Sequence, residues 1–179
     1  MGDSIKTLVI HPTDITTHFL DAVYKNEDWT VITDPKTSNS NIRGAIHDHD
    51  RIICMGHGTP QGLISTTSHY NYRYMVGSGM VDLLREKDLV LIWCNADQFG
   101  RKYGLTGFIT GMIISEEIEA NMYNVNTVDG DIDESNRLFT DAITKTIKGT
   151  PEMIKEGGLE IYKGDSDVIA FNRENFNVF

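Results

Sequence analysis

Cysteine is scarce in this chain of 179 residues, which contains only Cys54 and Cys94. Two thiols inside apolar runs do not make the disulfide framework of a small secreted domain, and they indicate a reducing compartment. No apolar run approaches the ~20 residues that a membrane-spanning helix needs. The first residues also lack the pattern of a signal peptide. We therefore expect a cytoplasmic protein that does not associate with a membrane.

Positive charge is also in short supply. The chain has 16 Lys and Arg residues against 26 Asp and Glu residues, which gives a formal net charge of -10. A nucleic-acid-binding protein would show a basic stripe, so we expect no nucleic-acid partner. A cationic substrate remains compatible with this composition, because an acidic surface would attract it.

Several familiar site motifs are missing from the sequence. It contains no Gly-x-Ser-x-Gly elbow, no Walker A loop and no Gly-x-Gly-x-x-Gly after the first expected strand. These absences count against a serine hydrolase, a P-loop NTPase and a dinucleotide enzyme. A flavodoxin-like module that binds a nucleotide or flavin stays open as an alternative, although we expect no cofactor. His47 and His49 have the chemistry of metal ligands, but they precede a strand and more simply indicate a solvated helix end, so we expect no metal.

The order of apolar and polar segments predicts the fold class. Strand-like and helix-like segments alternate, which is typical of parallel α/β architecture. At this length we expect a single domain spanning residues 1–179, built as a three-layer α/β/α sandwich with a mostly parallel central sheet. The expected strands lie at 7–11, 29–33, 51–55, 89–93, 106–114, 159–162 and 168–171. The expected helices lie at 14–24, 40–47, 75–86, 115–123 and 131–147, and a hairpin or loop is expected at 59–68.

Two of these strands end in reactive side chains. The apolar run that begins at Arg51 leads to His57, and the run that begins at Leu89 leads to Cys94. Runs of this kind form central strands, whose carboxyl ends meet in one crevice. An imidazole there could deprotonate the thiol and make it a nucleophile, and the backbone N–H groups of Gly58 and Cys94 could stabilise an oxyanion. The alternative is that Cys94 is a small buried apolar residue and His57 a turn residue.

The same segments resemble a known family. An apolar strand ending in His-Gly, then a hairpin, a helix and a second apolar strand ending in Cys is similar to the caspase-like cysteine peptidases. This group contains caspases, metacaspases, clostripain, gingipains, separase and CHAT domains. The matching segments are 55–58 and 91–96, and the family's order of elements can be laid over residues 5 to 150. The resemblance implies that His57 is the general base, that Cys94 is the nucleophile and that Gly58 contributes to the oxyanion site. The residues that flank Cys94 match neither the caspase nor the metacaspase pattern.

The resemblance also suggests a substrate. Family members that cleave after Arg or Lys have an acidic side chain in the corresponding pocket, and Asp97 and Glu116 are the candidates here. His11, at the end of the first strand, could assist substrate binding, and the aromatic segment 69–74 could line the cleft. Helix-terminus and turn roles are the alternatives for these residues. We thus expect a peptidase that acts on a peptide or protein through an acyl-thioester. The alternative is an inactive or latent domain of the same fold that binds a protein or ligand.

Overall fold

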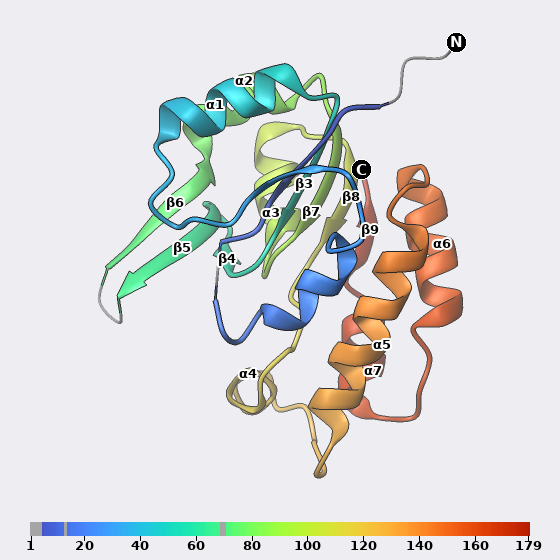
Figure 1. The fold of residues 1–179 in the computed structure, drawn as a ribbon. Helices are drawn as coiled ribbons and strands as arrows, with labels where there is room; N and C mark the ends of the chain where they lie inside the picture. Colours follow the sequence, from blue (N-terminus) through green and yellow to red (C-terminus); the bar gives the residue numbers. More distant parts are fainter. Residues whose placement is uncertain (1–4, 13, 69–70) are drawn as a thin grey trace.

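A six-stranded sheet forms the centre of the protein (Figure 1). The computed structural model describes residues 5–12, 14–68 and 71–179. Neighbouring strands in the sheet follow the order β2 (Thr30–Ile32), β1 (Thr7–Ile10), β3 (Arg51–Met55), β7 (Asp88–Ile92), β8 (Gly107–Thr110) and β9 (Phe176–Val178). The first five strands pair in parallel, and β9 runs antiparallel to β8. The predicted α/β class and mostly parallel sheet are therefore confirmed.

The register of the central strands fixes the position of the two reactive residues. Strands β3 and β7 are neighbours, and Met55 at the end of β3 lies opposite Ile92 at the end of β7. Every residue of β3 is buried, as expected for a continuous apolar run covered on both faces. Because His57 and Cys94 each follow their strand by two residues, they emerge at the same edge of the sheet.

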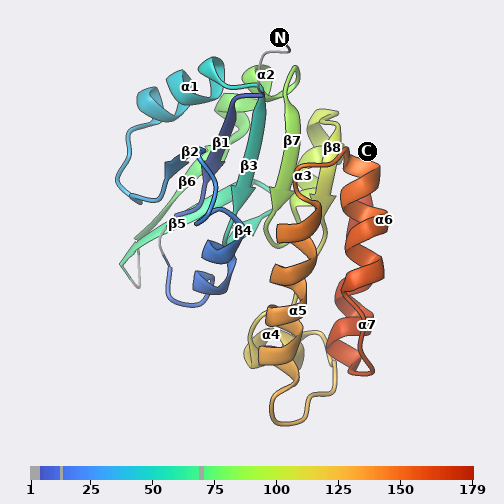
Figure 2. The ribbon, with the colours of Figure 1, turned by 45° about the vertical axis from the view of Figure 1, so that its right-hand side comes forward.

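Helices cover both faces of the sheet, which completes the predicted three layers (Figures 1 and 2). One face is covered by α1 (Asn39–Asp48), α2 (Val81–Leu84), which follows the 3-10 helix η2 (Ser78–Met80), and α3 (Ala96–Tyr103). The other face is covered by the 3-10 helix η1 (His18–Val23), α5 (Asp131–Thr146), α6 (Pro151–Ile161) and α7 (Asp167–Arg173). The short helix α4 (Glu117–Met122) lies beyond the carboxyl ends of the strands (Figure 2).

A second, antiparallel sheet projects from the main body (Figure 1). It consists of β4 (Gly58–Thr59), β5 (Gly62–Ser68) and β6 (Asn71–Gly77), which confirms the hairpin predicted in this region. The helix predicted at 75–86 is wrong in its first part, because residues 75–77 belong to β6, which pairs with β5, and only 81–84 form α2. Cross-strand pairing here overrides the apparent helical period.

The predictions for the last third of the chain are partly wrong. The two expected late strands lie in α6 and α7, and the chain returns to the sheet only at β9. Thr150 and Ser166 cap these helices by accepting hydrogen bonds from backbone N–H groups three residues later. A short apolar run cannot by itself distinguish a strand from a buried helix. The helix expected at 14–24 is reduced to η1, and α3 was not predicted.

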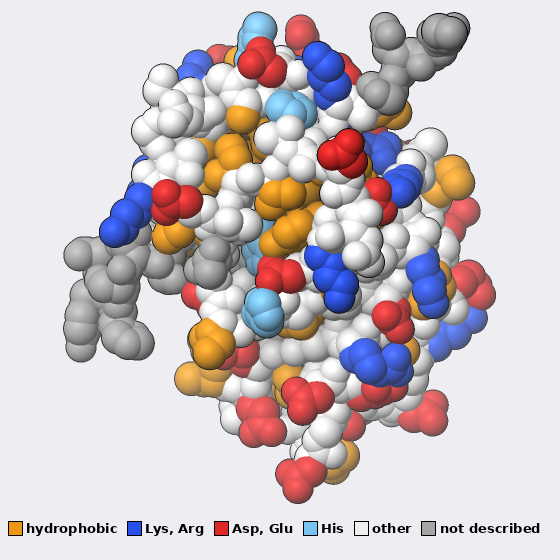
Figure 3. Space-filling view, in the orientation of Figure 1, with side chains coloured by type: hydrophobic (Ala, Val, Ile, Leu, Met, Phe, Trp, Pro, Cys, Tyr) orange, Lys and Arg blue, Asp and Glu red, His pale blue; other side chains and the backbone are white. Residues whose placement is uncertain are grey.

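The surface around α4 and the start of α5 is acidic. Figure 3 shows several Asp and Glu side chains at the lower end of the molecule, where Figure 1 places these two helices. The sequence of this region contains Glu116, Glu117, Glu119, Asp129, Asp131, Asp133 and Glu134. Within the residues described, no helix has both the length and the apolar composition to cross a membrane.

Candidate functional site

His57 and Cys94 line the same small cavity at the carboxyl ends of β3 and β7. The cavity has a volume of about 30 Å³ and is closed mainly by apolar side chains, among them Ile92, Ile113 and Phe139. A space of this size holds roughly one water molecule. The sequence therefore predicted correctly that His57 and Cys94 lie at one cavity. The cavity is too small to admit a substrate side chain beside the thiol.

The His57 ring is held by Thr16 and Asp14 from the loop after β1. Thr16 Oγ1 lies 2.7 Å from Asp14 Oδ1, to which it donates, and 2.6 Å from His57 Nε2. A hydroxyl has a single hydrogen to donate, so Thr16 Oγ1 must accept from His57 Nε2–H. In neutral His57 this leaves the lone pair on Nδ1, which has no hydrogen-bond partner among the described residues. The loop thus selects the tautomer in which Nδ1 can act as a base.

Cys94 is held as a protonated thiol. Its Sγ lies 3.6 Å from the carbonyl oxygen of Ile113 and 3.8 Å from Oε1 of Glu119. Burial raises the pKa of the Cys94 thiol to about 12, and the negative charge of Glu119 adds to this rise. The backbone groups of Ile113 and of Cys94 itself oppose this rise in pKa only in part. Between the described residues no hydrogen bond joins Cys94 to His57, so the thiol is not activated in this arrangement.

Glu119 reaches Cys94 because it caps its own helix. Its Oε2 accepts hydrogen bonds from the backbone N–H groups of Ser115, at 2.8 Å, and Glu116, at 3.2 Å. Glu116 completes the capping box at the start of α4. These bonds leave Oε1 directed at the thiol. The spacing of Glu116 and Glu119 could have predicted the capping box, but its position over Cys94 depends on the course of the chain after β8.

Gly58 packs against the ring of Trp93. A Cβ atom at this position would overlap the indole, so only glycine fits between β4 and the end of β7. The Trp93 Nε1–H donates to the carbonyl oxygen of Thr59 at 3.1 Å, which fixes the ring. Gly58 lies just outside the lining of the cavity that holds Cys94, whereas Gly56 belongs to it. Close packing against Trp93 therefore explains why position 58 is a glycine. The role of Gly58 in an oxyanion site stays a prediction.

The two acidic residues predicted to bind substrate have different positions. Asp97 lies in the first turn of α3, where its carboxylate is 3.8 Å from Arg101 Nε, and it lines neither the Cys94 cavity nor the groove beside it. Glu116 lines that groove, which has a volume of about 640 Å³. Ser115 and Phe19 belong to both spaces, so the groove opens next to the cavity. The structure thus brings Glu116 to the site and leaves Asp97 outside it.

His11 lies in the core rather than in the site. Its ring contacts Tyr24 Oη at 3.0 Å and Thr17 Oγ1 at 3.2 Å, and it is 3.2 Å from Asp21. It is 2% exposed and does not line the cavity or the groove. The structure therefore does not support the expectation that His11 binds substrate. Its contacts instead attach η1 to the end of β1.

The burial of His11 predicts a dependence of stability on pH. Burial lowers the pKa of His11 from 6.5, although the charge of Asp21 partly opposes this. The unfolded state then binds more protons in acid, so the contribution of His11 to stability is complete above pH 6.5 and is lost as pH falls below that value. We expect His11→Gln to reduce the loss of unfolding free energy between about pH 7.5 and 5.5, measured by urea denaturation. His47→Gln, at an exposed position, should leave the loss unchanged, and an equal effect of both variants would contradict this assignment.

The remaining sequence candidates lie away from the cavity. His47 contacts Asp48 and His49 contacts Thr30, both before β3 and so at the opposite end of the sheet. Within the described part of the chain no cluster of three or more His, Cys, Asp or Glu residues could hold a metal ion. His69 and Tyr70 of the aromatic segment lie outside the described residues, and neither Tyr72 nor Tyr74 lines the cavity.

The sequence of this chain matches no protein-family model and no curated protein.

Proposed function

We propose that this protein is a latent cysteine peptidase of the caspase-like type. The observation that carries the proposal is the convergence of His57 and Cys94 on one cavity from the ends of adjacent parallel strands. A base and a nucleophile in this relation meet the first requirement of thiol catalysis. The tautomer selected by Thr16 and Asp14 supports the role of His57, because it leaves Nδ1 as the proton acceptor.

In the proposed reaction the thiol proton of Cys94 passes to His57 Nδ1, and Sγ adds to the carbonyl carbon of the scissile peptide bond. The imidazolium then gives its proton to the departing amine as the C–N bond breaks, which leaves a thioester on Cys94. A water molecule adds to the thioester carbonyl and gives a proton to His57. Collapse releases the carboxylic acid, and the proton returns from His57 to Sγ. Thr16 and Asp14 hold the ring in place during these steps.

The groove beside the cavity favours a basic side chain in the substrate. Its lining contains the carboxylates of Glu116, Asp133 and Asp141. The guanidinium of Arg137 also lines it, but Arg137 is already paired with Asp141 and with Glu134. The lining therefore keeps an excess of negative charge. An Arg or Lys side chain of a peptide would complement this charge, in agreement with the acidic surface at this end of the molecule.

The second candidate is a domain of the same fold that binds a protein or ligand without catalysis. The protonated thiol and the closed cavity favour this candidate as long as segment 113–119 stays over Cys94. The two candidates differ in what happens when the segment is released. A latent enzyme becomes active, whereas a binding domain gains thiol exposure without peptide hydrolysis.

Glu119→Ala removes the hydrogen bonds that hold Ser115 and Glu116 as well as the charge beside Sγ, so it releases the segment. Hydrolysis of fluorogenic peptides by this variant distinguishes the two candidates. We expect this variant to cleave peptides that present Arg at the scissile bond faster than matched peptides with Asp. We also expect Cys94→Ala and His57→Ala, in the same background, to abolish cleavage. Asp133→Asn should lower the ratio of the cleavage rates of the Arg and Asp peptides, because it removes one negative charge from the groove. Fast alkylation of Cys94 in Glu119→Ala without cleavage of any peptide would favour the binding domain.

A further inference from the structure

A second large cavity lies on the other side of the sheet, between α1, the base of the β5–β6 hairpin, η2 and the end of α3. Its volume is about 580 Å³, within the range of small-molecule sites. The charged side chains of its described lining are Arg43 and Lys102, with no carboxylate beside them. A lining of purely positive charge is unexpected in a protein of net charge -10.

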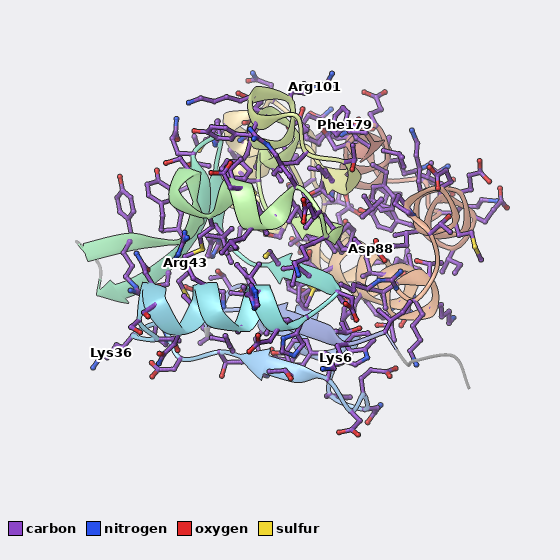
Figure 4. All side chains as sticks on the ribbon, turned by 90° about the horizontal axis from the view of Figure 1, so that it is seen from above. Lys6, Lys36, Arg43, Asp88, Arg101 and Phe179 are labelled. Atoms are coloured by element: carbon purple, nitrogen blue, oxygen red, sulfur yellow. The ribbon has the colours of Figure 1, made fainter. Side chains whose placement is uncertain are left out.

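The two cations come from different helices and are both available to a ligand. Arg43 lies in the middle of α1 and donates from one Nη to the carbonyl oxygen of Gly79, which leaves most of its N–H donors unused. Figure 4 shows Arg43 on the side of α1 that faces α2. Lys102 lies in the last turn of α3, with its Nζ 5.1 Å from the centre of the Tyr103 ring. Among the described residues neither cation forms an ion pair with a carboxylate.

Two aromatic side chains and an apolar side chain also line the cavity, together with the polar residues Asn39, Gln61 and Ser78. Tyr74 and Tyr103 are half-buried in the lining, and Met80 is buried beneath it. Tyr103 is held by a ring contact with Phe99 at 4.9 Å, and Tyr74 by a hydrogen bond of 3.2 Å from its hydroxyl to Thr59 Oγ1. Two fixed rings beside two cations offer stacking for a planar group and charge for an anion on that group.

We propose that this cavity binds a phosphomonoester carried on a planar ring. The two cations match the double negative charge of such a phosphate, and the guanidinium of Arg43 suits its geometry. The ring of the ligand packs against the tyrosines. The site is independent of Cys94, because the central sheet separates the α1–α3 face from the cavity that holds the thiol.

Phenyl phosphate is a suitable probe, with binding followed by ¹H–¹⁵N NMR on the intact chain. We expect the amide chemical shifts of residues 77–79 to change saturably as phenyl phosphate is added. Phenol and inorganic phosphate should both bind more weakly than phenyl phosphate. Arg43→Gln and Lys102→Gln should each weaken binding at least about tenfold, the effect of losing one charge-assisted hydrogen bond. Lys102→Gln removes none of the hydrogen bonds seen in the structure, so it tests the site even if Arg43→Gln disturbs α1.

Lys145→Gln is the matched control, since Lys145 is an exposed lysine on α5 at the other face of the sheet. It should bind phenyl phosphate like the unmodified protein. Three results would overturn the proposal. These are chemical-shift changes that do not saturate, a loss of affinity in Lys145→Gln equal to that in Arg43→Gln and Lys102→Gln, or phenol binding as tightly as phenyl phosphate. The last result would identify an apolar site without anion recognition.

Discussion

Glu119→Gln is expected to raise the alkylation rate of Cys94 by iodoacetamide at neutral pH at least about tenfold, corresponding to one unit of pKa. The carboxylate lies 3.8 Å from Sγ and disfavours the thiolate, so removing its charge lowers the pKa of the thiol. Glutamine keeps a side-chain oxygen that can accept the capping hydrogen bonds of α4. Cys54 is fully buried and its pKa is raised, so the reacting thiol is Cys94, which peptide mapping checks.

Glu117→Gln is the control for this effect. Glu117 lies in the first turn of the same helix but is exposed, so the variant changes the same charge without changing the surroundings of Sγ. It should leave the alkylation rate within about twofold of the unmodified protein, because an exposed carboxylate is screened by solvent. Equal acceleration in both variants would mean that Glu119 acts through the stability of α4 and not through its charge.

Gly58→Ala is expected to lower the free energy of unfolding by about 2–3 kcal/mol. The added methyl group overlaps the Trp93 ring, which is 2% exposed and fixed by its hydrogen bond to Thr59. This overlap strains the backbone next to both reactive residues, because Gly58 directly follows His57 and Trp93 directly precedes Cys94. Urea denaturation measures the free energy of unfolding. The alkylation rate of Cys94 in the Glu119→Gln background shows whether His57 and Cys94 still act together.

Gly44→Ala is the matched glycine substitution. Gly44 lies inside α1 with no atom within 4 Å of an added Cβ, so alanine there should stabilise the protein by about 0.5–1 kcal/mol. A Gly58→Ala protein as stable as the unmodified one would show that Trp93 moves easily. The packing of β4 would then not determine the geometry of the site.

The central strands could be predicted because their pattern is local. β3 and β7 are apolar throughout or nearly so, and a run of this length buried on both faces has few other structures available. The elements after residue 148 could not be predicted in the same way. Gly158 in α6 packs against Phe176 of β9, which lies far along the chain, and the short segments alone do not show this contact.

The candidate site could be predicted only where the sheet determines it. Parallel pairing brings His57 and Cys94 to one edge whatever the loops do, so the sequence was sufficient for these two residues. Thr16 and Glu119 lie on connections whose paths depend on tertiary packing, and nothing in their local sequence marks them as neighbours of the dyad. Asp97 follows Cys94 closely in sequence, but α3 directs it toward Arg101.

The pH dependence of Cys94 alkylation in Glu119→Gln and in Glu119→Gln/His57→Ala tests the central claim most directly. If His57 is the base of a Cys94 nucleophile, the inflection in the alkylation rate of the single variant should lie at a lower pH than that of the double variant. Identical profiles in the two proteins would contradict the dyad. Cys94 would then be a buried thiol released by the loss of a neighbouring charge, with no catalytic partner in His57.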